Sequence, residues 1–180
     1  MQLNAVLDRP YAGRRGEAYT RAGDRDVADV IGALATLACS LFAGAAVYIT
    51  LVEHPARLSC GTEVAARQWA PSYKRATVMQ VSLAVVATLA GLAEWVGGAG
   101  APWLIGALVV VSVIPFTVVA ILPTNNKLLE PGRDQGSEET RQLLETWGRQ
   151  HAVRSFVSLV ATLVYLYALV GSRGGPTRGS

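Results

Sequence analysis

The sequence predicts an all-α integral membrane protein, a four-helix up-and-down bundle with a helical extension before the fourth span. Only 16% of the 180 residues are charged, whereas an average soluble domain has about 25%. The charges leave four stretches without any Asp, Glu, Lys or Arg, at 30–52, 76–93, 95–126 and 155–172. Because roughly 20 apolar residues of helix cross a bilayer core, each stretch supplies or nearly supplies one span. This composition excludes a soluble enzyme, a disulfide-rich secreted domain and a disordered chain.

The first predicted span covers 30–52 and follows a polar leader. Residues 1–26 are rich in Arg, Asp and Gly and lack apolar periodicity, so we expect a flexible N-terminal tail before a transmembrane domain at 27–172. The leader and span lack the short apolar region and small-residue cleavage site of a signal peptide, which favours a retained anchor. Residues 173–180, where Gly and Pro dominate, are the expected C-terminal tail.

The second, third and fourth spans are predicted at 76–97, 102–123 and 153–171. A glycine-rich run that ends at Pro102 predicts a tight turn between spans two and three. Pro115 lies inside the third span and is expected to kink it.

Two longer loops, at 53–75 and 124–152, are expected to contain helix boundaries. In the first loop, Gly61 and the residues after it are suited to a helix stop and restart. In the second, the chain is expected to turn at Pro131-Gly132 and to resume a helix at Ser137, whose hydroxyl can cap it. Apolar residues at helical spacing then continue into span four, which predicts the helical extension.

The up-and-down topology places the unusual polar residues at one end of the bundle. The C-terminal ends of spans one and three meet the N-terminal ends of spans two and four there. These four ends carry His54 and Arg57; Trp69, Tyr73 and Gln80; Asn125 and Asn126; and Trp147, His151 and Arg154. Both histidines of the chain are in this set, each with an arginine three residues later. The grouping predicts a small-molecule site at this mouth of the bundle.

Each of these residue types also has an ordinary role at a membrane interface. Arginines at span ends are typical of headgroup anchors, and Trp and Tyr are typical of an aromatic belt. Asn125 and Asn126 follow Pro123, as residues at a plain helix exit do. These alternatives remain open at the level of the sequence.

Charge patterning bears on the possible partners. The net charge is +3, but no basic stripe with interleaved aromatics occurs, so no nucleic-acid partner is expected. The expected partners are the lipid bilayer and a lipophilic aromatic small molecule, while the oligomeric state stays open.

Lysines and arginines are almost evenly divided between the two sides of the membrane, which leaves the orientation of the protein open. The expected location is a multi-pass position in the plasma (inner) membrane.

The strings that carry these residues resemble a known family. They are Val52-Glu-His-Pro-Ala-Arg57, Trp69-x-Pro-x-Tyr73-x-Arg75-Ala-x-x-Met79-Gln80, Pro123-Thr-Asn-Asn126 and Trp147-x-x-x-His151-x-x-Arg154. Together they resemble the anthrone oxygenase-like family of small four-span membrane proteins, many bacterial members of which are known only as a domain of unknown function. The resemblance covers about residues 30–171.

This resemblance implies a membrane-embedded oxygenase that oxidises an anthrone-like, lipophilic aromatic substrate with dioxygen. A neutral imidazole is a suitable base for the acidic C–H of an anthrone, and either His54 or His151 fits that role. Arg57 or Arg154, helped by Asn125 or Tyr73, is expected to stabilise the enolate oxygen. The aromatic mouth and Gln80 are expected to bind the substrate.

Alternatives remain to this cofactor-free oxygenase. Copper or iron held by His54 and His151, with Glu53 or water, is the metal-dependent version. A small transporter is less favoured because spans one, three and four lack a deep ionisable group. A non-catalytic structural or interaction protein leaves the gathering of His, Arg, Asn and Trp at one mouth without a purpose.

Overall fold

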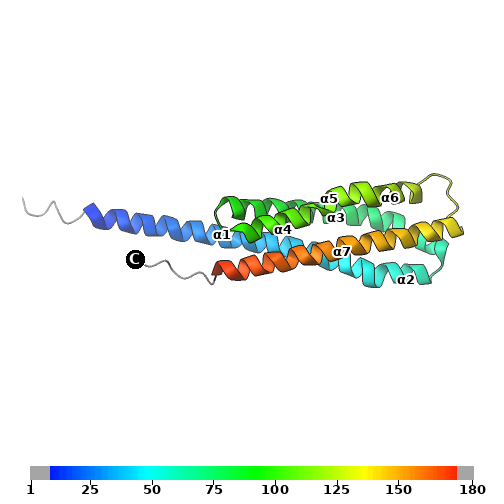
Figure 1. Cartoon of the computed structure of the whole chain (residues 1–180), viewed down its shortest axis with the longest axis horizontal. Helices are drawn as coiled ribbons and strands as arrows, with labels where there is room; N and C mark the ends of the chain where they lie inside the picture. Colours follow the sequence, from blue (N-terminus) through cyan, green and yellow to red (C-terminus); the bar gives the residue numbers. More distant parts are fainter. Residues whose placement is uncertain (1–8, 174–180) are drawn as a thin grey trace, which may run out of the picture.

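The predicted spans form one elongated helical bundle in the computed structural model, which describes residues 9–173 (Figure 1). Within this part of the chain, four helices are long and apolar enough to cross a membrane, and no strand occurs. They cover Asp26–Ser59, Thr62–Val96, Ala101–Leu128 and Glu138–Ser172. The predictions of an all-α four-helix bundle and of a multi-pass membrane protein are therefore confirmed.

The four spans are built from nine helical segments in the described residues. The first span comprises α1 (Arg9–Tyr48), the π-helix η1 (Ile49–Glu53) and α2 (His54–Ser59); the second is α3 (Thr62–Val96); the third comprises α4 (Ala101–Val111), α5 (Val113–Phe116), the π-helix η2 (Thr117–Ile121) and α6 (Leu122–Leu128); the fourth is α7 (Glu138–Arg173). Helix α1 packs against α3 and α7, and α4 packs against the same two helices. This is the neighbour pattern of an up-and-down bundle.

Two prolines explain the π-helices in the first and third spans. A proline inside a helix lacks an N–H and clashes with the carbonyl four residues earlier. Pro55 stands four residues after Leu51 in η1, and Pro123 stands four residues after Val119 in η2. A wider π turn makes room at each of these carbonyls, and such turns are frequent at functional sites. The two spans thus change geometry at the end where the candidate site residues lie.

The helix boundaries lie largely where the sequence predicts them. Gly61 has φ of 90° and separates α2 from α3, a conformation that glycine adopts without strain. Helix α7 follows Ser137, whose Oγ accepts a hydrogen bond from the backbone N–H of Thr140 at 3.2 Å. Helix α4 ends at Val111, the carbonyl that the ring of Pro115 opposes, so the third span is interrupted as expected.

One helix begins earlier than the sequence predicts, and another continues without a break through a predicted loop. Helix α1 begins at Arg9, so residues 9–26, expected to be a tail, are helical and extend past the bundle (Figure 1). The five arginines and three alanines among these residues are good helix formers, and the helix continues into the first span. Helix α3 begins at Thr62 and runs through Pro71, so Trp69 and Tyr73 lie on a helix. Residues 1–8 and 174–180 lie outside the described chain.

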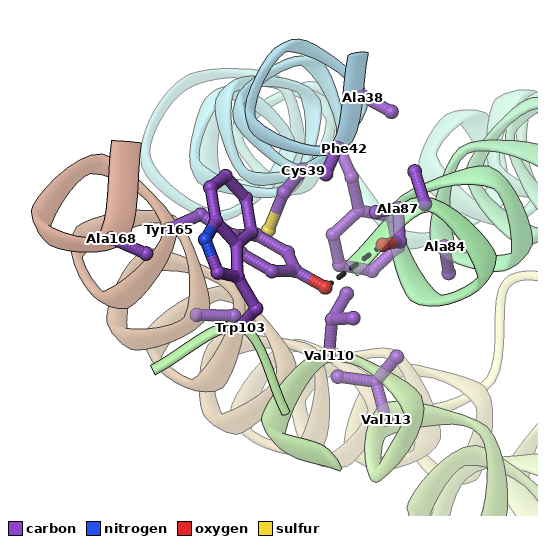
Figure 2. Packing of buried hydrophobic residues seen from close by; sticks show 13 residues of the cluster. Ala38, Cys39, Phe42, Ala84, Ala87, Trp103, Val110, Val113, Tyr165 and Ala168 are labelled. Carbon is purple, nitrogen blue, oxygen red and sulfur yellow. Dashed lines mark hydrogen bonds between the residues drawn. The ribbon is translucent and has the colours of Figure 1, made fainter. Parts of the chain in front are cut away.

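The end of the bundle away from η1 and η2 is packed around Tyr165 of α7, and we call it the core half. The Tyr165 hydroxyl donates to the backbone carbonyl of Ala87 on α3 at 2.8 Å (Figure 2). A Cβ atom added to Gly106 of α4 would meet the Tyr165 ring at 2.6 Å. Small residues therefore let α3 and α4 close tightly on this tyrosine, as helix packing in membranes requires. This rigid half holds the four helix ends that carry the site.

Candidate active site

The other end of the bundle, which we call the site half, buries most of the residues predicted to form a site. Buried here are His54 and Arg57 of α2, Trp69 and Gln80 of α3, Asn125 of α6, and Trp147, His151 and Arg154 of α7. Tyr73 is half-buried, while Asn126 is exposed and turned away from the group. Two histidines, two arginines and two amides therefore share one interior, a costly arrangement unless they are paired or serve a ligand.

Trp147 is the aromatic centre of this group. Its ring centroid lies 5.0 Å from that of His54 and 4.8 Å from that of His151. Trp69 meets Trp147 edge-on at 5.8 Å and stacks on Tyr73 at 5.0 Å with an interplanar angle of 3°. Trp69 and Trp147 are only 1% and 5% exposed, so they pack inside the bundle and do not form a lipid-facing belt.

A chain of hydroxyl groups fixes the orientation of His151. Ser155 Oγ lies 2.9 Å from the Ala46 carbonyl oxygen, which only accepts, so the serine donates to it. Thr50 Oγ1 lies 2.7 Å from Ser155 Oγ and 3.0 Å from His151 Nδ1. With the Ser155 hydrogen used, Thr50 donates to Ser155 and accepts from the Nδ1–H of His151. This assignment leaves His151 Nε2 as an unprotonated acceptor.

His54 is held differently. Its Nε2 lies 3.0 Å from the carbonyl oxygen of Leu144, so Nε2 carries the hydrogen and donates it. Its Nδ1 is buried and has no hydrogen-bond partner among the described residues. The ring lies against Gly148, where an added Cβ would come within 2.7 Å of it. The structure thus holds His54 against helix α7, through the Leu144 carbonyl, Gly148 and the Trp147 ring.

The two arginines differ in their partners. Arg57 Nη2 lies 2.6 Å from Glu53 Oε1, one helical turn earlier, although the angle is not that of a hydrogen bond. That carboxylate also accepts from Gln68 and Ser72, both at 2.9 Å. The Arg154 guanidinium lies 5.1 Å over the ring of Phe42, and no carboxylate pairs with it in the described bundle. Arg154 is therefore the buried cation with the larger unmet need for a negative partner.

These side chains surround a small cavity of about 20 Å³, enough for roughly one water molecule. Its wall includes Arg57, Tyr73, Gln80, Asn125, Trp147, His151 and Arg154. His54 does not line this cavity. Around it, Asn125 Oδ1 and Nδ2, Gln80 Nε2 and Arg154 Nε are buried without a partner in residues 9–173. Such orphaned polar atoms are rare in folded proteins and are expected where a ligand supplies the missing partners.

Comparison with known proteins identifies the family. The family described as anthrone oxygenase matches residues 69–164, more than half of the chain. The chain belongs to the anthrone oxygenase family. This confirms the resemblance carried by the four sequence strings, and it supports an oxygenase, an oxidoreductase of anthrone oxygenase type.

Individual anthrone oxygenases match over most of their length. The chain is 30% identical to anthrone oxygenase tpcL of Aspergillus fumigatus, over 74% of this chain and 89% of that protein. It is 32% identical to anthrone oxygenase gedH of Aspergillus terreus, over 75% of this chain and 96% of that protein. It is also 32% identical to anthrone oxygenase AgnL2 of Paecilomyces divaricatus, over 79% and 93% of the two chains. No solved structure matches the chain.

Anthrone oxygenases are cofactor-independent enzymes. Within residues 9–173, no group of three or more His, Cys, Asp or Glu side chains is arranged to hold a metal ion. The two imidazoles named for copper or iron each use one ring nitrogen in the protein, through Leu144 and Thr50.

The sequence did not reveal the residues that orient the histidines. Thr50 and Ser155 each lie one helical turn from a histidine, Thr50 before His54 and Ser155 after His151. A hydroxyl at that spacing is the available signal, but such residues are common in membrane helices and bond to their own backbone. Gly148 was missed because nothing in the sequence shows which ring lies against it.

Proposed function

We propose that this protein oxidises an anthrone-like, lipophilic aromatic compound with dioxygen to the quinone, inside the membrane and without a cofactor. The observation that carries the proposal is the cavity lined by His151, Asn125 and Arg154, with unpartnered polar atoms around it. A base, hydrogen-bond donors and a buried cation are what proton abstraction next to an aromatic carbonyl requires. Family membership supports the same reaction class.

His151 is the base in this proposal. It lines the cavity, and its Nδ1 is engaged with Thr50, so Nε2 is the ring nitrogen available to take a proton. A base held by a third group in one tautomer is the recurrent arrangement of acid–base sites. His54 does not line the cavity and contacts Trp147, which suits a residue that positions the indole.

In this proposal, Arg154, Asn125 and Gln80 stabilise the negative charge on the enolate oxygen. All three are buried, line the cavity and carry an unpartnered nitrogen among the described residues. Donors that are already desolvated and oriented stabilise a developing negative charge without reorganisation. Arg57 also lines the cavity but is neutralised by Glu53, so it contributes less charge. Trp69, Trp147 and Tyr73 provide flat apolar surfaces.

The reaction balances without a further reactant. His151 takes the proton of the acidic C–H bond, and the resulting anion passes one electron to dioxygen. The carbon radical and superoxide combine to form a C–O bond, and the hydroperoxide regains the proton. Loss of one water molecule from the hydroperoxide then leaves the second quinone carbonyl. Each turnover consumes one dioxygen and releases one quinone and one water.

Oxygen uptake with an anthrone tests this proposal in purified protein reconstituted in lipid nanodiscs. We expect one dioxygen to be consumed for each quinone formed. Because a general base contributes about 10²- to 10⁴-fold, His151→Ala is expected to lose activity by that factor. Leu163→Ala on the same helix is the control, since Leu163 is 65% exposed outside the site. Wild-type rates in His151→Ala would overturn the role of the base.

Two further measurements separate the alternatives. A preparation shown by elemental analysis to be free of copper and iron is expected to keep full activity, and activity that needs either metal would overturn the cofactor-free version. Accumulation of the aromatic in sealed vesicles without chemical change would support a transporter in its place. The four apolar helices support a membrane setting. The plasma (inner) membrane is the one proposed, and membrane fractionation tests it.

A further inference from the structure

A second cavity adjoins the first and leads toward the lipid. It has a volume of about 120 Å³ and lies among α1, α3, α5, η2 and α7. Tyr73, Thr77, Gln80, Thr117 and Arg154 line both cavities. A single layer of side chains therefore separates the larger space from the one at His151.

The outer edge of this second cavity faces the membrane. Val81 of α3 is 44% exposed, Ile114 of α5 is 36% exposed and Val118 of η2 is 55% exposed. The inner wall is buried and includes Phe42, Ala84 and Val113. Figure 2 shows these three side chains grouped between α1, α3 and the third span. The cavity thus runs from lipid-facing aliphatic side chains to a buried floor.

The helices on either side of this opening are not tightly joined. Helix α3 packs along α4, but it makes at most isolated contacts with α5, η2 and α6, which lean on α7. The third span is interrupted between α4 and α5 and widens into η2. Neither the interruption nor the π-helix carries small residues that pack closely on a neighbouring helix, as Gly106 and Ala87 do around Tyr165. The two segments therefore meet mainly through side chains, such as those of Trp69 and Ile121 in one buried cluster.

The buried polar atoms of this wall that lack a partner in the described chain lie at its inner end. Gln80 Nε2 and Arg154 Nε are buried there without partners in residues 9–173, and these two residues are 1% and 8% exposed. The remaining lining toward the lipid is aliphatic or aromatic apart from the two threonine hydroxyls. The occupant that matches this lining is flat and apolar, with a hydrogen-bond acceptor at its leading edge.

We infer that the gap between α3 and the α5–η2 segment is a lateral portal, through which a polycyclic aromatic ketone or phenol enters from the bilayer. Its rings lie between Val81 and Val118, and its oxygen reaches Gln80 and Arg154. The inference rests on the proposed function for the identity of the substrate. Neither cavity reaches the roughly 300 Å³ of a typical small-molecule site, so the ligand occupies both and parts the two helices.

Phenylalanine substitutions at the portal test the route without adding a tryptophan. The variants are Val118→Phe on η2 and Val81→Phe on α3. Their controls are Val119→Phe and Val85→Phe, which are 77% and 41% exposed on the same segments but do not line the cavity. The probe is anthraquinone, which the proposed reaction does not turn over. Binding is measured in nanodiscs through quenching of the tryptophan fluorescence, and Trp69 and Trp147 are the two of the four tryptophans that lie at the site.

Both portal variants are expected to raise the apparent Kd for anthraquinone at least tenfold, while both controls stay within twofold of the wild type. The melting temperature of each variant is measured in parallel, and the two helices give independent readings if one variant misfolds. Equal quenching by portal and control variants would overturn the portal, whether or not the protein oxidises anthrones. If the portal variants weaken binding but the wild-type protein oxidises no anthrone, the portal is supported and the oxygenase proposal is overturned.

Discussion

Two histidines in one aromatic cluster are made different by their hydrogen bonds. His54 donates through Nε2 to a backbone carbonyl, and His151 donates through Nδ1 to the Thr50 hydroxyl, which in turn donates to Ser155. Only His151 also lines the cavity. Tautomer and access, not residue type, therefore distinguish the proposed base from its neighbour.

Thr50→Val is expected to lower kcat by roughly 2- to 12-fold, because a hydrogen bond of about 0.5–1.5 kcal/mol that orients His151 is lost. Thr50→Ser keeps the hydroxyl and is expected to restore the rate. Thr88→Val is the control, since the Thr88 hydroxyl donates to Ala84 within its own helix. Nitrogen-15 NMR of the His151 ring measures the tautomer directly. An unchanged tautomer and rate in Thr50→Val would contradict the hydroxyl chain.

Gly148→Ala is expected to displace His54, because the added Cβ would lie 2.7 Å from Cδ2 and Nε2 of that ring. Overpacking of this kind costs about 1–3 kcal/mol, so the melting temperature falls. Gly171→Ala on the same helix meets nothing within 4 Å and is expected to stabilise the helix slightly. Thermal unfolding in detergent compares the two.

A double-mutant cycle provides the control for this contact. Combining Gly148→Ala with His54→Ala removes the ring that the new methyl group would meet, so the two effects are expected to be non-additive. Additive losses would mean that Gly148 matters for another reason, and equal melting temperatures for Gly148→Ala and Gly171→Ala would contradict the close contact between Gly148 and His54.

At the residue scale, the sequence predicted which chemical groups would be gathered but not how they would be bonded. Eight of the ten predicted residues are buried together because the ends of four antiparallel helices must meet. Asn126 is exposed although it adjoins buried Asn125, since neighbours on a helix point about 100° apart. That angle can be used only when the helix is known to continue past Pro123.

The two π-helices are the elements that shape the site. Thr50 lies on η1, and Thr117 and Ile121 of the cavity wall lie on η2. A π turn inserts one extra residue, so it rotates everything beyond it relative to the membrane-spanning part. Asn125 therefore faces the interior in a register that a regular α-helix would not give.

Pro123→Ala is expected to let η2 relax toward α-helix and to turn Asn125 away from the cavity. Activity then falls at least tenfold, while the melting temperature stays the same or rises, because the regular helix regains a hydrogen bond. Pro102→Ala is the matched control, since Pro102 lies in the first turn of α4, where proline is tolerated. Hydrogen exchange of the amides at 117–121 monitors the change directly. Unchanged exchange and activity would contradict this role for the proline.

At the element scale, turns were easier to predict than the starts of helices. Gly61 and Ser137 marked boundaries because their local chemistry decides them. The continuity of α3 through Pro71 is not visible in the sequence, because an interior proline usually kinks or ends a helix and costs about 3 kcal/mol or more. The prolines that accompany the π turns are visible in the sequence. A kink or a break in the helix accommodates an interior proline equally well, so the sequence alone does not predict a π turn.

The whole molecule divides its tasks between two halves. In the core half, Gly106 and Ala87 close on Tyr165 with its hydroxyl satisfied. The site half holds most of the buried polar atoms that lack partners in the described chain, and two cavities interrupt its packing. Sites that keep such groups sacrifice stability for function. Substitutions that make the site half resemble the core half should therefore stabilise the protein and inactivate it.

Asn125→Leu is the sharpest form of this expectation. Asn125 is 0% exposed and neither amide atom has a partner in residues 9–173, so leucine of similar size removes a desolvation penalty of about 1–3 kcal/mol. The melting temperature is expected to rise while oxidation of an anthrone falls by 10²-fold or more, as for other lost oxyanion donors. Asn126→Leu, at an exposed position one residue further, should change neither quantity by much. If Asn125→Leu instead destabilises the protein and leaves turnover intact, the amide is a structural element of the bundle and the polar cavity is not built for a ligand.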